Sequence, residues 1–275
     1  MILGGNGFIG RAIKSRLEFQ GVSVVSPNSE TLNLLHPNSA EFLSEIVKPA
    51  DTVVMLAAIT PDKGRDISSQ LRNLKMMESV CVALQRSVCA HFVYVSSDAV
   101  YDQGVSLVRE ATVASPTDLY GAMHLTREVM ARSLSPIPLL ILRPSIVYGT
   151  EDPHNSYGPN RFRRMVKQAG KITLFGLGEE YRDHIHVDDV ATLIVGCIFR
   201  KTVGILNLAT GTSYSFAEVA NIIVNKFDKG VKVEFASRSV PITHRHYDVT
   251  NLLKAFPNFS FLSLEEGIDQ LFSEK

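Results

Sequence analysis

The stretch Met1-Ile2-Leu3-Gly4-Gly5-Asn6-Gly7-Phe8-Ile9-Gly10 opens the chain and decides its fold. The apolar residues before the glycines predict a short β-strand. After the glycines, the spacing of Ile9, Ile13 and Leu17 predicts a helix with one apolar stripe, which packs on a sheet and ends near Gly21. The stretch therefore predicts a strand, a tight turn and a helix in immediate succession.

The three glycines of the turn have different functions. Gly4 permits a sharp turn, Gly7 lets a pyrophosphate approach the backbone, and Gly10 lets the helix pack closely on the strand. Free N–H groups and the helix dipole at this point favour phosphate. Because the glycines lie directly between a strand and a helix, the turn predicts dinucleotide binding. The expected contacts come from Gly4, Gly7, Phe8, Ile9, Gly10 and Arg11.

Short β-branched runs alternate with longer amphipathic segments through the first half of the chain. The runs are residues 22–25, 52–56, 92–95 and 139–142. This alternation is typical of βαβ units, so we expect an α/β fold, a Rossmann-type doubly wound parallel sheet. Further along, residues 161–168, 216–227 and 262–272 predict helices, and 207–211 predicts a strand with its turn.

The composition changes after Tyr148, where residues 149–160 are rich in glycine, proline, asparagine and histidine. We expect a dinucleotide-binding domain over 1–148 and a smaller C-terminal region, 149–275, that mainly binds substrate. Residues 186–210 are expected to return to the Rossmann sheet.

The bulk composition excludes several classes of partner. Lysine plus arginine and aspartate plus glutamate balance at 28 each, so no overall field attracts nucleic acid or an anionic membrane. No apolar run reaches the roughly 18 residues needed to span a bilayer, and the glycine turn begins too early for a signal peptide. Cys81, Cys89 and Cys197 show no C-x-x-C spacing, which indicates reduced thiols and a cytoplasmic location. The three-residue first strand is either unusually short or trimmed.

The end of the second predicted strand bears on the choice of dinucleotide. An acidic residue about 20 positions after the turn would bind the ribose 2′-hydroxyl of NAD. Ser26, Pro27 and Asn28 stand there instead, and Arg11 follows the turn. Short polar side chains with an arginine suit a 2′-phosphate, so NADP is slightly favoured over NAD, with contacts from Ser26 and Asn28.

A polar cluster follows the strand predicted at 92–95. The sequence Ser96-Ser97-Asp98-Ala99-Val100-Tyr101 places hydroxyls and a carboxyl at the carboxyl end of a parallel strand, the edge where such sheets bind ligands. A helix predicted to begin near Asp118 carries Tyr120 and His124 one turn apart on one face. A phenol and a base are therefore expected in one site.

These motifs together resemble the extended short-chain dehydrogenase/reductases of the NAD-dependent epimerase/dehydratase group, whose members modify nucleotide sugars. The motifs, in order, are Gly4-x-x-Gly7-x-x-Gly10, Leu56-Ala57-Ala58, Asn73, Ser96 to Tyr101, Tyr120-Gly121, Arg143-Pro144-Ser145-Ile146-Val147-Tyr148-Gly149, and Gly176-Leu177-Gly178 leading to Arg182-Asp183-His184-Ile185-His186-Val187-Asp188-Asp189-Val190. The resemblance implies that Tyr120 donates and accepts the proton and that Ser97 orients the sugar. It also implies cofactor contacts from Leu56, Ala57, Ala58, Asn73, Pro144 and Ile146.

His124 occupies the position of the family's lysine, whose charge favours the tyrosinate. A free phenol titrates near pH 10, whereas histidine is charged only below a pKa of about 6.5. Three readings stay open: an enzyme with an adapted Ser97, Tyr120 and His124 triad; a protein that binds cofactor without turnover; and a packing histidine with another group assisting the tyrosine.

The residues after Ser97 bear on the reaction. Family members that dehydrate sugars place an aspartate and a glutamate there, as acid and base, whereas this chain has Asp98 and Ala99. Asp98 can equally be structural, satisfying turn N–H groups. Dehydration is disfavoured, and we expect a nucleotide-sugar epimerase. An NADPH-dependent keto-sugar reductase and a non-catalytic nucleotide-binding protein are the alternatives.

Substrate contacts are expected from Asp98, Ala99, Asn160 and Arg182. The fork of Arg182 suits a diphosphate, and its alternative is an ion pair with Asp183, Asp188 or Asp189. The pairs His184/His186 and His244/His246 lack a carboxylate or cysteine at compelling ligand spacing, so no metal is expected. The apolar stripes of 71–84 and 123–130 either pair two subunits in a homodimer or pack on the sheet.

Overall fold

The computed structural model describes residues 1–227 and 230–273. The chain divides into two compact units, each assembled from separate segments. The first contains Met1–Asp102, Glu110–Pro144 and Val190–Leu208, and the second contains Gln103–Arg109, Ser145–Asp189 and the chain from Ala209 onward. The domain limits expected from the sequence, 1–148 and 149–275 with a return over 186–210, stay a prediction.

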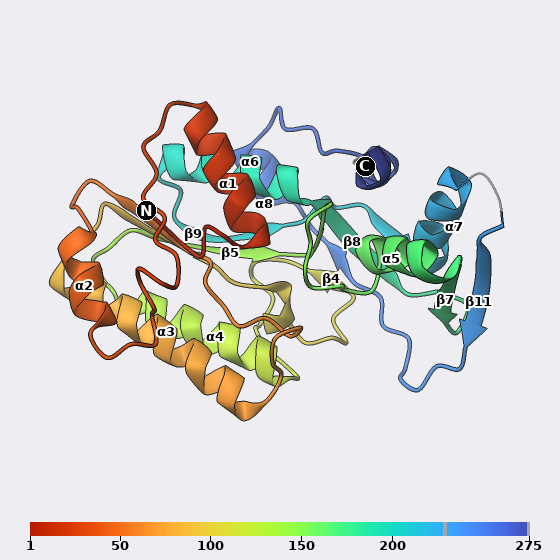
Figure 1. The fold of residues 1–275 in the computed structure, drawn as a ribbon, viewed down its shortest axis with the longest axis horizontal. Helices are drawn as coiled ribbons and strands as arrows, with labels where there is room; N and C mark the ends of the chain where they lie inside the picture. The colour runs from red at the N-terminus through yellow and green to blue at the C-terminus, as the bar shows by residue number, and fades with distance from the viewer. Residues whose placement is uncertain (228–229, 274–275) are drawn as a thin grey trace. The chain divides into compact units, whose positions relative to one another are not determined.

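The first unit is built on a five-stranded parallel sheet of order β1-β2-β3-β5-β9. The strands are β1 (Ile2–Leu3), β2 (Thr52–Met55), β3 (His91–Val95), β5 (Leu139–Pro144) and β9 (Gly204–Leu208). In Figure 1, helices α1 (Phe8–Phe19) and α6 (Val187–Arg200) lie on one face of this sheet, and α3 (Ile67–Arg86) and α4 (Leu119–Arg132) on the other, with α2 (Ser39–Ile46) beside α3. The predicted α/β doubly wound fold is confirmed.

The first helix buries a slightly different stripe from the predicted one. Ile13 and Leu17 are buried as expected, but Ile9 is only half-buried, and Phe8 and Gly10 turn inward beside them. Gln20 caps the helix, and Gly21 follows with φ +74°, the left-handed conformation that suits a helix end.

The strand predicted over 22–25 does not form. Val25 contributes one backbone bond, in which its carbonyl accepts from the N–H of Ile2 at 2.8 Å. Because β1 has only two residues and pairs with β2 along its other edge, it offers almost no ladder to a further strand. Pro27, which has no N–H, follows after Ser26.

The second unit holds three small sheets. β10 (Ser213–Ser215), β8 (Tyr181–His186) and β6 (Ile146–Tyr148) form one; β11 (Lys232–Ala236) pairs with β7 (Lys171–Phe175), and β12 (His246–Tyr247) with β4 (Leu107–Val108). Its helices are α5 (Pro159–Ala169), α7 (Phe216–Lys226), α8 (Thr250–Ala255) and α9 (Leu264–Ser273). The helices predicted at 161–168, 216–227 and 262–272 are present with ends shifted by one or two residues. The strand predicted at 207–211 begins earlier, at Gly204.

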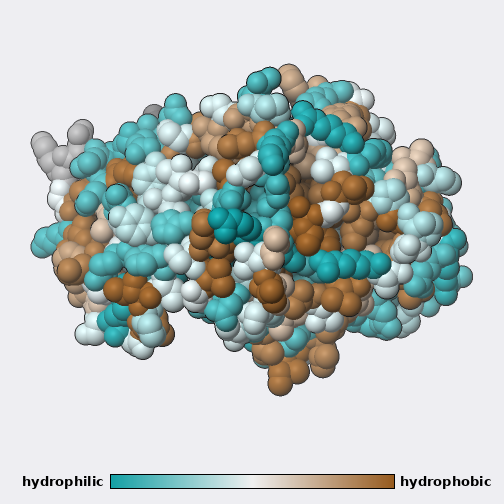
Figure 2. All heavy atoms as spheres, turned by 180° about the vertical axis from the view of Figure 1, so that it is seen from behind, coloured by the Kyte–Doolittle hydropathy of each residue, from teal (hydrophilic) through white to brown (hydrophobic). Residues whose placement is uncertain are grey.

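The apolar stripes predicted in the two central helices lie mostly inside the first unit, where α3 packs on α4. Met77, Val80 and Leu84 are fully buried, as is Met123, whereas Leu71 is 60% exposed. Figure 2 shows hydrophobic and hydrophilic side chains interspersed over the face that it presents. A homodimer stays a prediction. Within the described residues, no helix is long and apolar enough to cross a membrane.

Candidate functional site

The glycine turn closes against the loop that follows β2. Gly4 has φ +93°, and a Cβ there would lie 2.7 Å from the Ala57 nitrogen. A Cβ on Gly10 would lie 2.3 Å from the Gly4 carbonyl oxygen, to which the Gly7 N–H donates at 3.0 Å. Side chains at positions 4 and 10 would therefore separate the turn from the loop and the helix from the turn, so the start of α1 is fixed at the carboxyl edge of β1 and β2.

The side chains predicted around the turn differ in what they can offer a ligand. Phe8 points into the core, so only its backbone is available, and a guanidinium nitrogen of Arg11 donates to the Asn6 carbonyl at 2.8 Å. Ser26 Oγ is buried without a hydrogen-bond partner and lies where a Cβ on Gly5 would meet it at 1.9 Å. Asn28 Oδ1 accepts from the N–H groups of Glu30 and Thr31 and so caps a local turn. Of these predicted cofactor contacts, Ser26 is the one whose hydroxyl still lacks a hydrogen-bond partner.

The Asn73 side chain anchors the loop after β2 through two hydrogen bonds to its backbone. Its Oδ1 accepts from the Ile59 N–H at 2.8 Å, and its Nδ2 donates to the Ile59 carbonyl at 2.9 Å. The N–H groups of Leu56 and Ala57 both donate to the Leu3 carbonyl at 2.9 Å. Asn73 therefore positions the chain beyond Leu56-Ala57-Ala58 rather than extending a free amide. Of the remaining predicted contacts, Pro144 ends β5 and Ile146 begins β6 of the second unit.

Ser97 and Tyr120 meet because a short helix and α4 fit closely together. Ser97 caps the 3-10 helix η1 (Asp98–Val100), accepting from the Ala99 N–H at 3.1 Å, and Asp118 caps α4 through the Gly121 N–H at 2.7 Å. A Cβ on Gly121 would lie 2.1 Å from the Ala99 carbonyl oxygen, so only glycine lets α4 approach η1 this closely. At this contact Ser97 acts on Tyr120 and lowers the pKa of its phenol.

Tyr120 also lines a cavity of about 530 Å³ between the starts of α3 and α4. The cavity wall includes Ile59, Asp66, Ser69, Asn73, Asp118 and Met123. Burial and the carboxylate of Asp98 raise the pKa of Tyr120 to about 12, while Ser97 and the charge of Arg127 act in the opposite direction. Near pH 7 the side chain is therefore a phenol, able to donate a proton, and positive charge close to it favours the form that accepts one.

His124 is buried beneath Tyr120. The two rings meet edge to face with centroids 4.6 Å apart, and His124 Nδ1 lies 2.7 Å from the Tyr94 hydroxyl. Burial, with the positive charge of Arg127, lowers the pKa of His124 to about 3. The histidine is consequently neutral near pH 7, so it cannot supply the charge that a lysine would supply at this position.

Sequence reasoning missed two groups on the same helix. Arg127, seven residues after Tyr120, is buried, and its helical spacing was the available signal. Glu128 is fully buried and accepts from Arg143 Nε at 2.9 Å, from a terminal Arg143 nitrogen at 2.6 Å and from Ser96 Oγ at 2.7 Å. Because Ser96 precedes Ser97, the Glu128 carboxylate ties α4 to the end of β3 next to the Ser97–Tyr120 contact.

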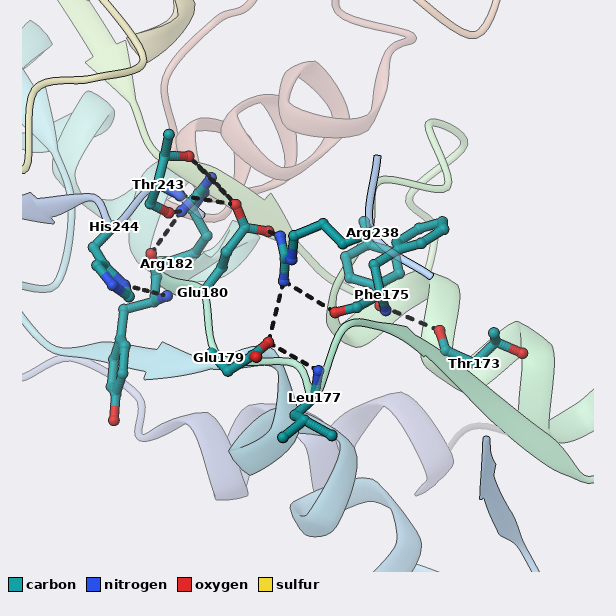
Figure 3. A network of polar contacts seen from close by, with 11 residues as sticks. Thr173, Phe175, Leu177, Glu179, Glu180, Arg182, Arg238, Thr243 and His244 are labelled. Atoms are coloured by element: carbon teal, nitrogen blue, oxygen red, sulfur yellow. Dashed lines mark hydrogen bonds and ion pairs between the residues drawn. The ribbon is translucent and has the colours of Figure 1, made fainter. Parts of the chain in front are cut away.

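In the second unit, Arg182 lies in a polar network with a second arginine (Figure 3). One terminal nitrogen of Arg182 donates to Thr243 Oγ1 at 2.9 Å and lies 3.5 Å from Glu180 Oε1. Arg238, which sequence reasoning missed, contacts Glu180 Oε2 at 2.8 Å and Glu179 at 3.3 Å. Burial favours a higher pKa for Glu180, but Arg238 and Arg182 hold it below its usual value. The ion-pair partner of Arg182 seen here, Glu180, was not among the three aspartates considered.

Asp183, the next residue, is instead a buried acceptor. It accepts from Ser145 Oγ at 2.9 Å, Thr210 Oγ1 at 2.8 Å and the Gly211 N–H at 2.8 Å. Burial raises the pKa of its carboxyl to about 6 despite these bonds. Asn160, the other predicted substrate contact in this unit, is buried in α5, and its Oδ1 accepts from the Gly149 N–H at 3.4 Å.

The histidine pairs do not assemble a metal site. His184 is buried and neither ring nitrogen has a hydrogen-bond partner, while the rings of His244 and His246 stack with centroids 6.5 Å apart. Over residues 1–227 and 230–273, no three histidine, cysteine, aspartate or glutamate side chains come together to hold an ion.

Known proteins resemble this chain in sequence and in fold. The sequence pattern of the NAD dependent epimerase/dehydratase family matches residues 1–209. A dTDP-L-rhamnose 4-epimerase from Burkholderia thailandensis is 30% identical over 171 residues, which are 59% of this chain and 47% of that protein. The match thus spans about half the length of that curated relative.

Solved structures match almost the whole chain. UDP-glucuronic acid 4-epimerase from Bacillus cereus, in complex with UDP-glucuronic acid and NAD, aligns with TM-score 0.84 at 20% identity, covering 98% of this chain and 96% of that one. RMD from Pseudomonas aeruginosa, complexed with NADPH, aligns with TM-score 0.85 at 18% identity, covering 99% and 97%. At these identities the structures show the shared Rossmann-type fold. One of these neighbours holds NAD and the other NADPH.

Proposed function

Because the chain belongs to the NAD dependent epimerase/dehydratase family, we propose that it is an NAD(P)-dependent epimerase of a nucleotide-activated sugar. The observation that carries the proposal is that η1 and α4 bring Ser97 and Tyr120 together at the carboxyl edge of the sheet, where Ser97 lowers the pKa of the phenol. Ligands of doubly wound sheets bind at this edge. The glycine turn supplies the dinucleotide end of the same edge.

Each of the two hydroxyls has a chemical task in this proposal. Ser97 orients the reacting hydroxyl of the sugar and holds it against Tyr120. Tyr120 takes the proton of that hydroxyl as the carbon is oxidised, and returns it when the ketone is reduced from the other face. The chemistry that NAD(P) supplies when bound is reversible acceptance of a hydride from the sugar carbon.

Two buried atoms without partners support the fit of a dinucleotide. Ser26 Oγ lies against the glycine turn, and His124 Nε2 lies beneath Tyr120. Buried polar atoms are nearly always paired, so each of these suits a ligand hydroxyl or phosphate. Gly4 and Gly10 provide the close approach that a pyrophosphate needs.

Epimerisation is preferred over dehydration because Ala99 offers no second acid or base beside Asp98. The epimerases named above act at carbon 4, which makes carbon 4 the first position to test. Reduction of a keto sugar by NADPH is the second candidate, because no carboxylate stands at 26–29 to bind a ribose 2′-hydroxyl and RMD binds NADPH.

The decisive experiment incubates the purified protein, loaded with NAD or NADP, with single epimers of UDP- and dTDP-hexoses. Chromatography should reveal the partner epimer without net change of NAD(P)H. Tyr120→Phe should bind cofactor normally and lose at least about 100-fold in turnover, as expected for a missing acid/base. Stoichiometric consumption of NADPH would favour the reductase. Failure to convert any hexose of the panel with either cofactor would reject the proposal.

We also propose that Arg182 binds the diphosphate of the substrate, exchanging its contact with Glu180 for phosphate oxygens. A planar guanidinium can form two parallel bonds to such a group. Arg182→Gln should therefore raise KM for the nucleotide sugar about tenfold or more and change kcat much less. Lys171→Gln, which removes an exposed pair with Glu234 in the same unit, is the control. Equal effects of the two variants on KM would contradict the assignment.

A further inference from the structure

Arg127 lies on the same face of α4 as Tyr120 and His124. Residues at i, i+4 and i+7 of a helix share one face, so Arg127 is two turns from the tyrosine with the histidine between them. It is 1% exposed. A guanidinium keeps its charge in proteins, and burying one is costly unless that charge is compensated or used.

The contacts of Arg127 compensate its charge only in part. A terminal nitrogen donates to the Ala57 carbonyl at 2.9 Å, the guanidinium carbon lies 5.5 Å from the centre of the Tyr94 ring, and Nε has no hydrogen-bond partner. No carboxylate pairs with Arg127 in the described part of the chain. Arg143, a second buried arginine near α4, differs because its guanidinium forms an ion pair with Glu128 at 2.6 Å. The positive charge of Arg127 therefore acts on the ionisable side chains around it.

The contact of Tyr94 with His124 and the nearby charge of Arg127 favour one position for the proton of His124. The positive charge of Arg127 lowers the pKa of Tyr94, so the arrangement that turns the Tyr94 oxygen toward the guanidinium is favoured. The Tyr94 O–H is then left to donate to His124 Nδ1, 2.7 Å away. A neutral imidazole that accepts at Nδ1 carries its proton on Nε2. This Nε2–H is buried and without a partner, and it lies on the helix face of Tyr120.

We propose that Arg127 replaces the missing lysine as the cation that favours the tyrosinate form of Tyr120, while neutral His124 contributes a hydrogen-bond donor through Nε2. A charge and a donor that one lysine would combine are thus divided between two residues of α4. Arg127 is a positioning residue that acts through Tyr120, and the inference rests on the proposed function.

The charges around Tyr120 on the other elements oppose Arg127. Asp98 on η1 and Asp118 at the start of α4 both disfavour the tyrosinate, and Ser97 favours it. Arg127 is the cation that acts on Tyr120 in this set. On α3, the charge of Arg127 also acts to lower the pKa of the Cys81 thiol, although burial dominates and raises that pKa to about 11. Among the charges that shift the pKa of Tyr120, removing Arg127 leaves the carboxylates of Asp98 and Asp118, while Arg65 lines the cavity that Tyr120 faces.

A titration of the phenol tests the proposal without requiring turnover. Difluorotyrosine, whose phenol is more acidic than that of tyrosine, is installed at position 120, and its ionisation is followed by fluorine NMR with NADP bound. Arg127→Gln should raise the pKa by about one unit or more, because a nearby opposite charge lowers a pKa by roughly one to three units. Arg127→Lys should stay within about 0.3 units of the parent, because it keeps the charge. His124→Asn should do the same, because the histidine is neutral.

The same variants, made with the natural tyrosine, give the kinetic readout. Arg127→Gln should shift the pH profile of kcat upward by the same amount, with about tenfold slower turnover at pH 7 for a one-unit shift. The double variant Arg127→Gln/His124→Lys should restore the parent profile, because it moves the cation one turn closer to Tyr120.

The outcomes separate the two proposals. If Arg127→Gln folds, binds NADP and leaves the fluorotyrosine titration unchanged, the assignment of Arg127 is overturned, whether or not the protein epimerises sugars. If the titration shifts but no sugar is converted, the inference stands and the proposed function fails. Arg127→Met fills the buried volume without the charge and takes the place of the glutamine variant where that variant does not fold.

Discussion

Glu128→Gln tests how strongly the buried pair with Arg143 holds α4 on the sheet. Glu128 is fully buried and Arg143 nearly so, and two of the three short bonds to the carboxylate come from the guanidinium. The amide keeps one oxygen but turns an N–H toward a donor, so the Arg143 charge is left unpaired. Breaking a buried pair in this way costs about 3–5 kcal/mol. With a urea m-value of about 2–3 kcal/mol/M, the unfolding midpoint should fall by roughly 1–2 M.

Arg132→Gln is the matched control, because Arg132 approaches the same carboxylate from the surface. Its contact is 3.5 Å long and its side chain is 49% exposed, so it should contribute under about 1 kcal/mol. Far-UV circular dichroism in urea at pH 7 measures both midpoints. If Glu128→Gln shifts the midpoint no more than Arg132→Gln does, the buried pair is not what anchors α4.

Three further predictions concern stability and can be checked by the same unfolding assay. Gly10→Ala should destabilise by about 1–3 kcal/mol, and Gly7→Ala by less, because the added Cβ lies 2.3 Å from the Gly4 oxygen in the first and 3.2 Å in the second; the reverse order would contradict the packing account. His124 stays neutral in the folded state down to a pKa of about 3, whereas the unfolded chain protonates it below about 6.5, so its contribution to stability falls as pH falls through this window, by about 1.4 kcal/mol per pH unit. His124→Asn should therefore lower the slope of unfolding free energy against pH by one proton relative to the parent. Asp183 contributes to the slope with the opposite sign in both proteins, so the comparison cancels its effect. Equal slopes in the two proteins would show that the histidine is not buried in its neutral form. Ser215 caps α7 by accepting, through its Oγ, from the Glu218 N–H at 3.1 Å. Ser215→Ala should therefore lower the free energy of unfolding by about 1 kcal/mol, whereas Ser44→Ala within α2 should change it by less than about 0.5 kcal/mol.

Sequence was sufficient wherever backbone chemistry decides the structure. The turn from Gly4 to Gly10 was predictable because positive φ and close packing select glycine, and α7 was predictable from its amphipathic pattern. The strand expected at 22–25 failed because β-propensity requires a partner, and β1 has too few residues to provide one.

The electrostatics of the site depended on burial that no sequence pattern reveals. His124 was recognised as the unusual residue, but its neutrality follows from being 3% exposed beside Arg127. Arg127 was not singled out from the sequence, because its importance depends on the packing that places its guanidinium carbon 5.5 Å from the centre of the Tyr94 ring. Arg238 was unforeseen for another reason: it meets Glu180 only through the tertiary fold, as Figure 3 shows.

The most direct measurement of the central claim follows one hydrogen atom. A nucleotide hexose carrying deuterium on carbon 4 is incubated with the protein and unlabelled NAD(P). Both epimers are then recovered, and the deuterium content of each is measured by mass spectrometry. Transient oxidation with return of the same hydride predicts that substrate and product epimer both keep the deuterium, with none released to water. Loss of the label to solvent, or its accumulation in reduced cofactor, would contradict the account.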